Sequence, residues 1–222
     1  MTIRVALAGN PNSGKTTLFN ALTGSNQRVG NWPGVTVDKK EGVLKGHKDV
    51  IIEDLPGIYS LSPYTMEEVV SREYLINDRP DLIVNLVDGS NLVRNLYLTS
   101  QLAELEIPMV ISLNMMDIVK SKGDKIDIKA LEEKLNIPIV ETVAAREKGV
   151  DKLIAKILEV AKDGQKPKEM VFDADLEEAL KPIEADLKPI VGEDLSRYYS
   201  IKAFENDEES LGHIKLTSEL KT

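Results

Sequence analysis

Three scarcities narrow what this chain can be. It has no cysteine, so it forms no disulfide and offers no thiolate to a metal ion. Its two histidines, His47 and His213, lie far apart in the sequence, which disfavours a transition-metal site. No apolar run approaches the ~18–20 residues that cross a bilayer, and we expect no signal peptide because the chain begins directly with a strand pattern.

Basic residues are fewer than acidic ones, with 28 Lys and Arg against 37 Asp and Glu. The net charge is −9 and the pI is about 4.9, so we expect no nucleic-acid partner. The length of 222 residues suits one domain with a small appendage. A polar stretch at 163–168 has the composition of a linker, and we therefore predict a domain over 1–165 and a helical appendage over 166–222, which could be truncated.

Residues 9–16 match the phosphate-loop pattern G-x-x-x-x-G-K-[ST], between an apolar strand and a helical pattern. Backbone N–H groups of such a loop, together with a helix N-terminus, bind phosphate oxygens. Lys15 would reach the β- and γ-phosphates and the Thr16 hydroxyl would bind Mg²⁺. The loop residues expected to surround the nucleotide are Asn10, Pro11, Asn12, Ser13, Gly14, Lys15, Thr16 and Thr17.

Strand and helix patterns alternate through the first 165 residues. Six strands are expected, at 3–8, 37–44, 49–55, 81–88, 108–113 and 137–142. Helices are expected from 17, and over 66–77, 92–105, 128–135 and 150–161, with 25–35 as a loop. This order predicts an α/β fold with a mostly parallel six-stranded sheet and one antiparallel edge strand. In such sheets the ligand lies at the carboxyl ends of the strands.

Further motifs follow those strand ends. Asp54 and Gly57 form D-x-x-G: the carboxylate would hold Mg²⁺ and the Gly57 N–H would meet the γ-phosphate. Asn114 and Asp117 form N-x-x-D. The carboxylate of this motif can accept two hydrogen bonds from guanine, and adenine lacks that pair of donors. Met115 stands where lysine is usual, and its flexible thioether could replace the contact of the lysine's aliphatic stem with the base. The alternative role for Asn114 and Asp117 is a helix N-cap.

Two loops complete the predicted site. Val143, Ala144 and Ala145 would approach the guanine O6 through a backbone N–H, which we assign to Ala144. Thr36, in a mobile loop with Gly34 and Val35, would complete the Mg²⁺ shell when a γ-phosphate is present. The alternative for Thr36 is a surface threonine that enters a strand.

The appendage carries apolar residues at helical spacing from Leu176 to Ile190. Pro182 and Pro189 interrupt that stripe, so kinked or broken helices are expected there. Another helix is expected over 195–204. Acidic runs such as Asp207-Glu208-Glu209 are interpreted as solvated faces.

The motifs at 10–16, 29–37, 54–61 and 114–117 together closely resemble the N-terminal cytosolic domain of the ferrous iron transport protein B (FeoB) family, within the TrmE-Era-like GTPases. The Asn-Trp-Pro-Gly-Val-Thr-Val segment at 31–37 is its most specific feature. The resemblance implies a Ras-like fold, slow GTP hydrolysis with GTP or GDP and Mg²⁺ as ligands, and a membrane iron permease as partner. It also implies a position on the cytoplasmic side of the cell membrane; homo-oligomerisation is possible.

Ile58 stands where Ras-like switches carry a water-orienting glutamine. The resemblance therefore implies K⁺ stimulation, with Asn12 as K⁺ ligand, while the alternative is that Asn12 only shapes the loop. Lys15, Thr36, Gly57 and Asn12 are the expected catalytic set. Two other functions stay open: a nucleotide-sensing module with incidental hydrolysis, and an Era-like RNA-associated GTPase, for which the appendage lacks basic character.

Overall fold

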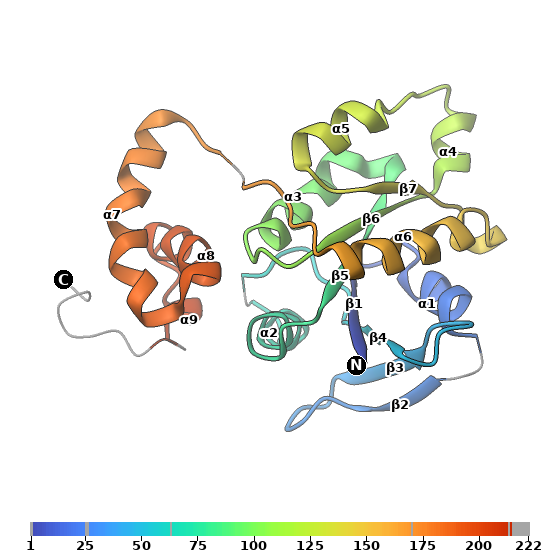
Figure 1. The fold of residues 1–222 in the computed structure, drawn as a ribbon, viewed down its shortest axis with the longest axis horizontal. Helices are drawn as coiled ribbons and strands as arrows, with labels where there is room; N and C mark the ends of the chain where they lie inside the picture. Colours follow the sequence, from blue (N-terminus) through green and yellow to red (C-terminus); the bar gives the residue numbers. More distant parts are fainter. Residues whose placement is uncertain (1, 25–26, 63, 170, 213, 215–222) are drawn as a thin grey trace.

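The computed structural model describes residues 2–24, 27–62, 64–169, 171–212 and 214, and these form a layered α/β domain followed by a helical region (Figure 1). The described residues contain a seven-stranded sheet of order β2-β3-β4-β1-β5-β6-β7. Its strands are β1 (Ile3–Gly9), β2 (Gln27–Asn31), β3 (Asp38–Val43), β4 (Val50–Asp54), β5 (Leu82–Asp88), β6 (Met109–Asn114) and β7 (Ile139–Glu141). Strands β4, β1, β5, β6 and β7 are mutually parallel.

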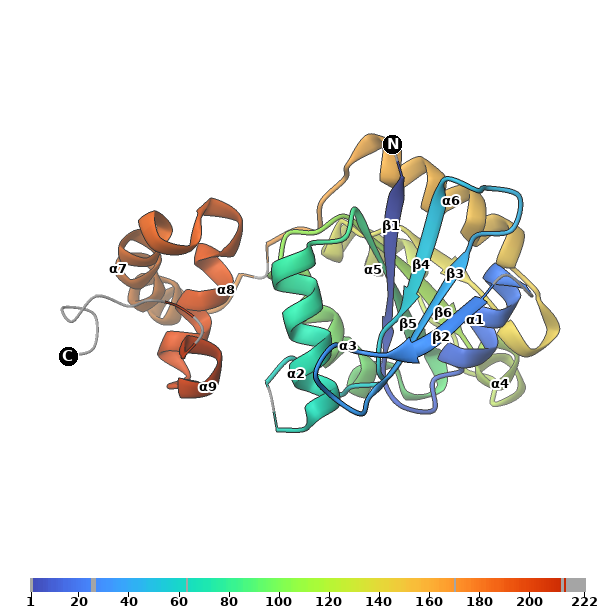
Figure 2. The same ribbon diagram turned by 90° about the horizontal axis from the view of Figure 1, so that it is seen from below.

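Helices cover both faces of the sheet, because its central strands are apolar on both sides. On β1, Val5 and Leu7 pack with α1 (Lys15–Thr23) and α6 (Val150–Asp163), whereas Ala6 and Ala8 face the opposite core. Figure 2 shows α1 and α6 on one side and α2 and α3 on the other. The second side carries α2 (Met66–Glu73), its π-helical continuation Tyr74–Asp78, α3 (Leu92–Ala103), α4 (Met116–Ser121) and α5 (Ile128–Leu135).

The sheet has one strand more than the six expected, because the predicted loop at 25–35 contains β2. Residues 25 and 26 of that loop lie outside the described part. Strand β2 pairs antiparallel with β3, and β3 pairs antiparallel with β4, so β3 alone runs against the other strands, as expected of one antiparallel strand, and β2 is added outside it. Apart from half-buried Gln27, the side chains of β2 are exposed, which explains why no hydrophobic alternation marks it. Backbone pairing and the opposite charges of Arg28 and Glu41 favour this register.

The C-terminal region consists of α7 (Ala174–Val191), α8 (Glu193–Phe204) and α9 (Glu208–Leu211). The expectation of a broken helix is wrong: α7 runs through both Pro182 and Pro189. Each proline removes a backbone donor, but buried Leu180 and Leu187 supply tertiary packing that offsets the loss. The end of the appendage, residues 215–222, lies outside the described part.

The helical region contacts the α/β domain beside α2. Arg72 on α2 donates to the Ser210 hydroxyl at 3.1 Å, and the buried Lys202 ammonium on α8 donates to the Ser62 hydroxyl at 3.3 Å. Tyr198 belongs to the same apolar cluster as residues of the sheet's α2 side. No helix among the described residues is both long enough and apolar enough to traverse a bilayer.

Candidate nucleotide site

The loop between β1 and α1 has a backbone that its sequence requires. Asn12 and Gly14 adopt left-handed conformations, with φ of 63° and 96°. A Cβ on Gly14 would lie 2.6 Å from Asn114 Nδ2, so this position demands glycine. No side chain caps α1, and its first-turn N–H groups therefore remain available to an anion. The loop thus has the geometry of a phosphate-binding site.

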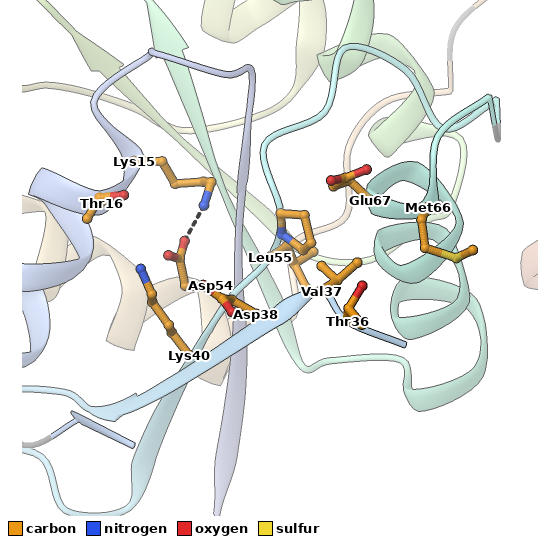
Figure 3. Close-up of a pocket in the computed structure, with 11 residues that line it drawn as sticks. Lys15, Thr16, Thr36, Val37, Asp38, Lys40, Asp54, Leu55, Met66 and Glu67 are labelled. Atoms are coloured by element: carbon orange, nitrogen blue, oxygen red, sulfur yellow. Dashed lines mark hydrogen bonds and ion pairs between the residues drawn. The ribbon is translucent and has the colours of Figure 1, made fainter. Parts of the chain in front are cut away.

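Lys15 and Asp54 form a largely buried ion pair at the floor of a cavity of about 480 Å³ (Figure 3). Thr16 and Thr36 also line this cavity. Carboxylate and hydroxyl oxygens are the donors that Mg²⁺ prefers, so Thr16 and Asp54 fit that ion. Figure 3 shows Thr36 next to Val37, across the cavity from Thr16. The three predicted Mg²⁺ ligands therefore share one cavity but are not assembled around one point.

The D-x-x-G loop lies directly against the phosphate loop. A Cβ on Gly57 would come within 3.2 Å of the Pro11 Cα, so no larger residue fits without moving backbone. The Ile58 N–H donates to the Gly9 carbonyl at 3.2 Å, while the Ile58 side chain is buried in the core. Because the Ile58 side chain is apolar and buried, residue 58 offers no side-chain hydrogen bond to a ligand or a water molecule in the site.

Asn114 joins three of the predicted loops. Its buried Nδ2 donates to the Ser13 carbonyl at 2.9 Å, and its Oδ1 accepts from the Ala144 N–H at 3.0 Å. The Thr142 hydroxyl lies 3.4 Å from the same Oδ1 and 2.9 Å from the Ser112 hydroxyl. The first asparagine of N-x-x-D is thus a bracket between the phosphate loop and the loop after β7.

The contact between Asn114 and Ala144 bears on one predicted role. The Ala144 N–H was expected to bind the guanine O6, but it donates to Asn114 instead. A donor that is already paired within the protein is a poor candidate for a ligand contact. Within the same predicted loop, the Ala145 N–H is the next candidate for that role.

Asp117 lies in the first turn of α4 and lines a separate cavity of about 190 Å³ with Thr142 and Val143. Its Oδ1 accepts a hydrogen bond from the Ile118 N–H at 3.1 Å, and its Oδ2 lies 3.7 Å from Arg146 Nη2. Neither Asn114 nor Asp117 caps α4: the N-cap position is held by Met115, at φ 59°, without a side-chain hydrogen bond. The helix-cap alternative for this motif is therefore wrong.

A third cavity, of about 200 Å³, lies beside the phosphate loop and is absent from the sequence-based predictions. It is lined by Asn10, Pro11, Asn12, Ser13, Tyr59, Asp88, Asn91, Arg94 and Asn95. Asn12 faces this cavity rather than the one that contains Thr16 and Asp54. The polar run that begins at Asp88, directly after an apolar strand, was the available signal, because that strand ends at the same edge of the sheet.

Comparison with known proteins finds family matches in both parts of the chain. The family model described as ferrous iron transport protein B matches residues 3–157, and the one described as the FeoB cytosolic helical domain matches residues 172–222. The chain is 44% identical over 216 residues to a Porphyromonas gingivalis Fe(2+) transport protein A/Fe(2+) transporter FeoB fusion protein, covering 93% of this chain and 26% of that protein. It is 49% identical over 156 residues to the Escherichia coli Fe(2+) transporter FeoB, covering 68% and 20%.

Solved structures of S. thermophilus NFeoB have a similar fold. A point mutant bound to GDP gives a TM-score of 0.94 at 46% identity, covering 99% of this chain and 85% of that chain. The mGMPPNP-bound protein gives 0.87 at 46% identity, covering 98% and 82%. The chain spans about a quarter or less of the length of the curated transporters it matches.

Proposed function

Since the chain belongs to the ferrous iron transport protein B family, we propose that it binds guanine nucleotide and hydrolyses GTP to GDP and phosphate. The observation that carries this proposal is the Asn114 bracket, which holds the phosphate loop, the N-x-x-D segment and the loop after β7 at one edge of the sheet. Residues 1–165 would act as the GTP-binding domain and 166–222 as a helical domain.

Each loop has a role in this proposal. The backbone of residues 10–17 and the Lys15 ammonium bind the phosphates, and Lys15 leaves Asp54 to do so. Thr16 and Asp54 hold Mg²⁺, which when bound neutralises charge that develops on the phosphate oxygens. Asp117 selects guanine, and the Ala145 N–H contacts its O6. Met115 and Val143 would border the base.

Thr36 requires a movement before it acts. It lies across the cavity from Thr16, in a loop with Gly34 and Val35, and Gly34 has a φ of 77° that favours glycine. We propose that this loop closes over the γ-phosphate and brings the Thr36 hydroxyl to the metal. The Gly57 N–H would meet the γ-phosphate from the other side.

Hydrolysis should be slow and stimulated by K⁺. Ile58 is buried and orients no water, so turnover is expected within a few tens-fold of the ~10⁻⁴–10⁻³ s⁻¹ of unassisted Ras. The amide oxygen of Asn12 suits K⁺, and it would have to turn from the third cavity toward the phosphates. Asn12→Ala should remove the difference between rates in K⁺ and Na⁺ buffers. Equal wild-type rates in the two buffers would contradict this role.

The first experiment is a titration with GTP and ATP, followed by multiple-turnover phosphate release with Mg²⁺. We expect a strong preference for guanine and loss of affinity in Lys15→Ala and Asp117→Ala. Preference for ATP, or unchanged GDP affinity in both variants, would contradict the proposal. Binding without turnover in K⁺ would favour the second candidate, a nucleotide-sensing module, for which the buried Ile58 is the specific observation.

In the parent protein, we propose that this nucleotide cycle regulates ferrous iron uptake through a membrane permease, from the cytoplasmic side. The relatives that support this role are named as Fe(2+) transporters and extend far beyond the present chain. No group of three or more His, Cys, Asp or Glu side chains that could hold a metal ion occurs among the described residues. Era-like action on RNA remains disfavoured by the net charge of −9.

A further inference from the structure

Arg94 and Tyr59 form a contact that the roles above do not use. The Arg94 guanidinium carbon lies 4.4 Å from the centroid of the Tyr59 ring. Both residues line the third cavity together with Asn12 of the phosphate loop. No ion pair joins Arg94 to a carboxylate within the residues the structure describes. Its defined partner is therefore an aromatic ring that comes two residues after the glycine of D-x-x-G.

The backbone explains why Tyr59 is placed there. The Ile58 N–H is bonded to the Gly9 carbonyl and its side chain is 2% exposed. The next side chain therefore points outward, and Tyr59 is 41% exposed. It is the first side chain after Gly57 that reaches a cavity beside the phosphate loop. Whatever restrains Tyr59 also restrains the segment that holds Gly57.

We propose that Arg94 is a positioning residue for GTP hydrolysis: it holds the Tyr59 ring and thereby keeps Gly57 in place against Pro11. This inference rests on the proposed hydrolytic function. The tight packing at Gly57 makes the position sensitive, because a Cβ there would already come within 3.2 Å of Pro11. Small shifts of this segment would move the Gly57 N–H away from a γ-phosphate, and misplacement of this kind lowers rates.

The exposure of the pair separates this role from a merely structural one. Tyr59 and Arg94 are both exposed, so their replacement should leave thermal stability nearly unchanged. Loss of an exposed cation–π contact corresponds to about a threefold effect. If that contact positions Gly57 for reaction, the loss appears in kcat and not in GDP affinity, because GDP has no γ-phosphate.

The test measures GTP turnover, GDP affinity and melting temperature for Arg94→Gln, Tyr59→Leu and the double variant. We expect each single variant to lower kcat about threefold or more, with GDP affinity within about twofold of wild type. The double variant should be no slower than the slower single variant, because both remove one contact. Tyr59→Phe keeps the ring and should keep the rate. Tyr97→Leu, an exposed aromatic on the same helix, is the matched control and should match wild type.

Unchanged kcat in both single variants would overturn the inference. Strictly multiplicative losses in the double variant would also overturn it, because the residues would then act separately. A loss in Tyr59→Phe equal to that in Tyr59→Leu would assign the effect to the hydroxyl and reject the ring contact. Absence of GTP turnover in the wild-type protein would instead refute the proposed function. The two failures are distinguishable, because every result that overturns the positioning role requires an active wild-type protein.

Discussion

Removing the Asn114 side chain should uncouple the loops that it joins. In Asn114→Ala, the Ser13 carbonyl loses its donor and the Ala144 N–H loses its acceptor, both at a buried site. A buried polar group left unpaired costs about 1–3 kcal/mol, so two such groups cost roughly 2–5 kcal/mol after partial relaxation. For a chain of this size the melting temperature should fall by about 6–15 °C.

Nucleotide binding should fall further than stability alone would explain. The phosphate loop and the loop after β7 would no longer be held in one geometry, and GDP affinity should drop at least about tenfold, which corresponds to about 1.4 kcal/mol. The assays are thermal unfolding and a GDP titration at a temperature where both proteins are folded. Asn114→Asp keeps an acceptor for Ala144 but places a carboxylate against the Ser13 carbonyl, and it should also bind GDP weakly.

Asn85 provides the matched control. It is an equally buried asparagine on the neighbouring strand β5, and its Nδ2 donates to the Thr99 hydroxyl at 2.7 Å, away from the predicted loops. Asn85→Ala should lower the melting temperature while GDP affinity stays within about twofold. If Asn114→Ala behaves like this control, with lost stability and unchanged affinity, the bracket is structural only and the reasoning is refuted.

Three further predictions concern other parts of the chain. Burial raises the pKa of Glu104 from 4.5 to about 7. The contribution of this carboxyl group to the free energy of unfolding is therefore complete below pH 4.5 and is lost as the pH rises through 7. Urea unfolding at pH 8 should show that Glu104→Gln is more stable than wild type by up to about 3 kcal/mol, and this difference should be absent at pH 4.5. Gly57→Ala should lower GTP turnover at least about tenfold in a phosphate-release assay, because the added Cβ would press on the backbone of Pro11. An unchanged rate would show that the two loops can move apart without loss of function. The fluorescence of Trp32, which is buried edge-on against Tyr74, should differ between GDP and a GTP analogue, and no difference would argue against movement of its loop.

Much of the α/β domain could be predicted, because apolar runs mark its strands and helices and motif spacing marks its loops. The helix Ile128–Leu135 was predicted at its observed ends, and the parallel order follows from the alternation of strands with helices. Strand β2 could not be predicted, since its exposed side chains follow no hydrophobic period. Helix α4 was missed because six residues are too few for a periodic signal. Helix α7 shows packing overriding the local effect of Pro182.

The candidate site divides in the same way. Motif spacing identified Lys15, Asp54, Asn114 and Asp117, because those residue types recur with fixed chemistry at strand ends. Which hydrogen bond each group makes was not predictable: the pairing of Ala144 with Asn114 depends on the distance between two loops about thirty residues apart. The third cavity, too, arises from residues that meet only after α3 packs beside the D-x-x-G loop.

The pairing of Lys15 with Asp54 couples the binding of nucleotide to the binding of magnesium. A magnesium ion that arrives alone would have to compete with an ammonium group for the same carboxylate, whose side chain is only 5% exposed. A phosphate chain draws the ammonium away and frees the carboxylate, so each ligand should strengthen the binding of the other by an equal factor. Free divalent metal should consequently leave the empty protein almost untouched, and chelation should weaken the hold on nucleotide.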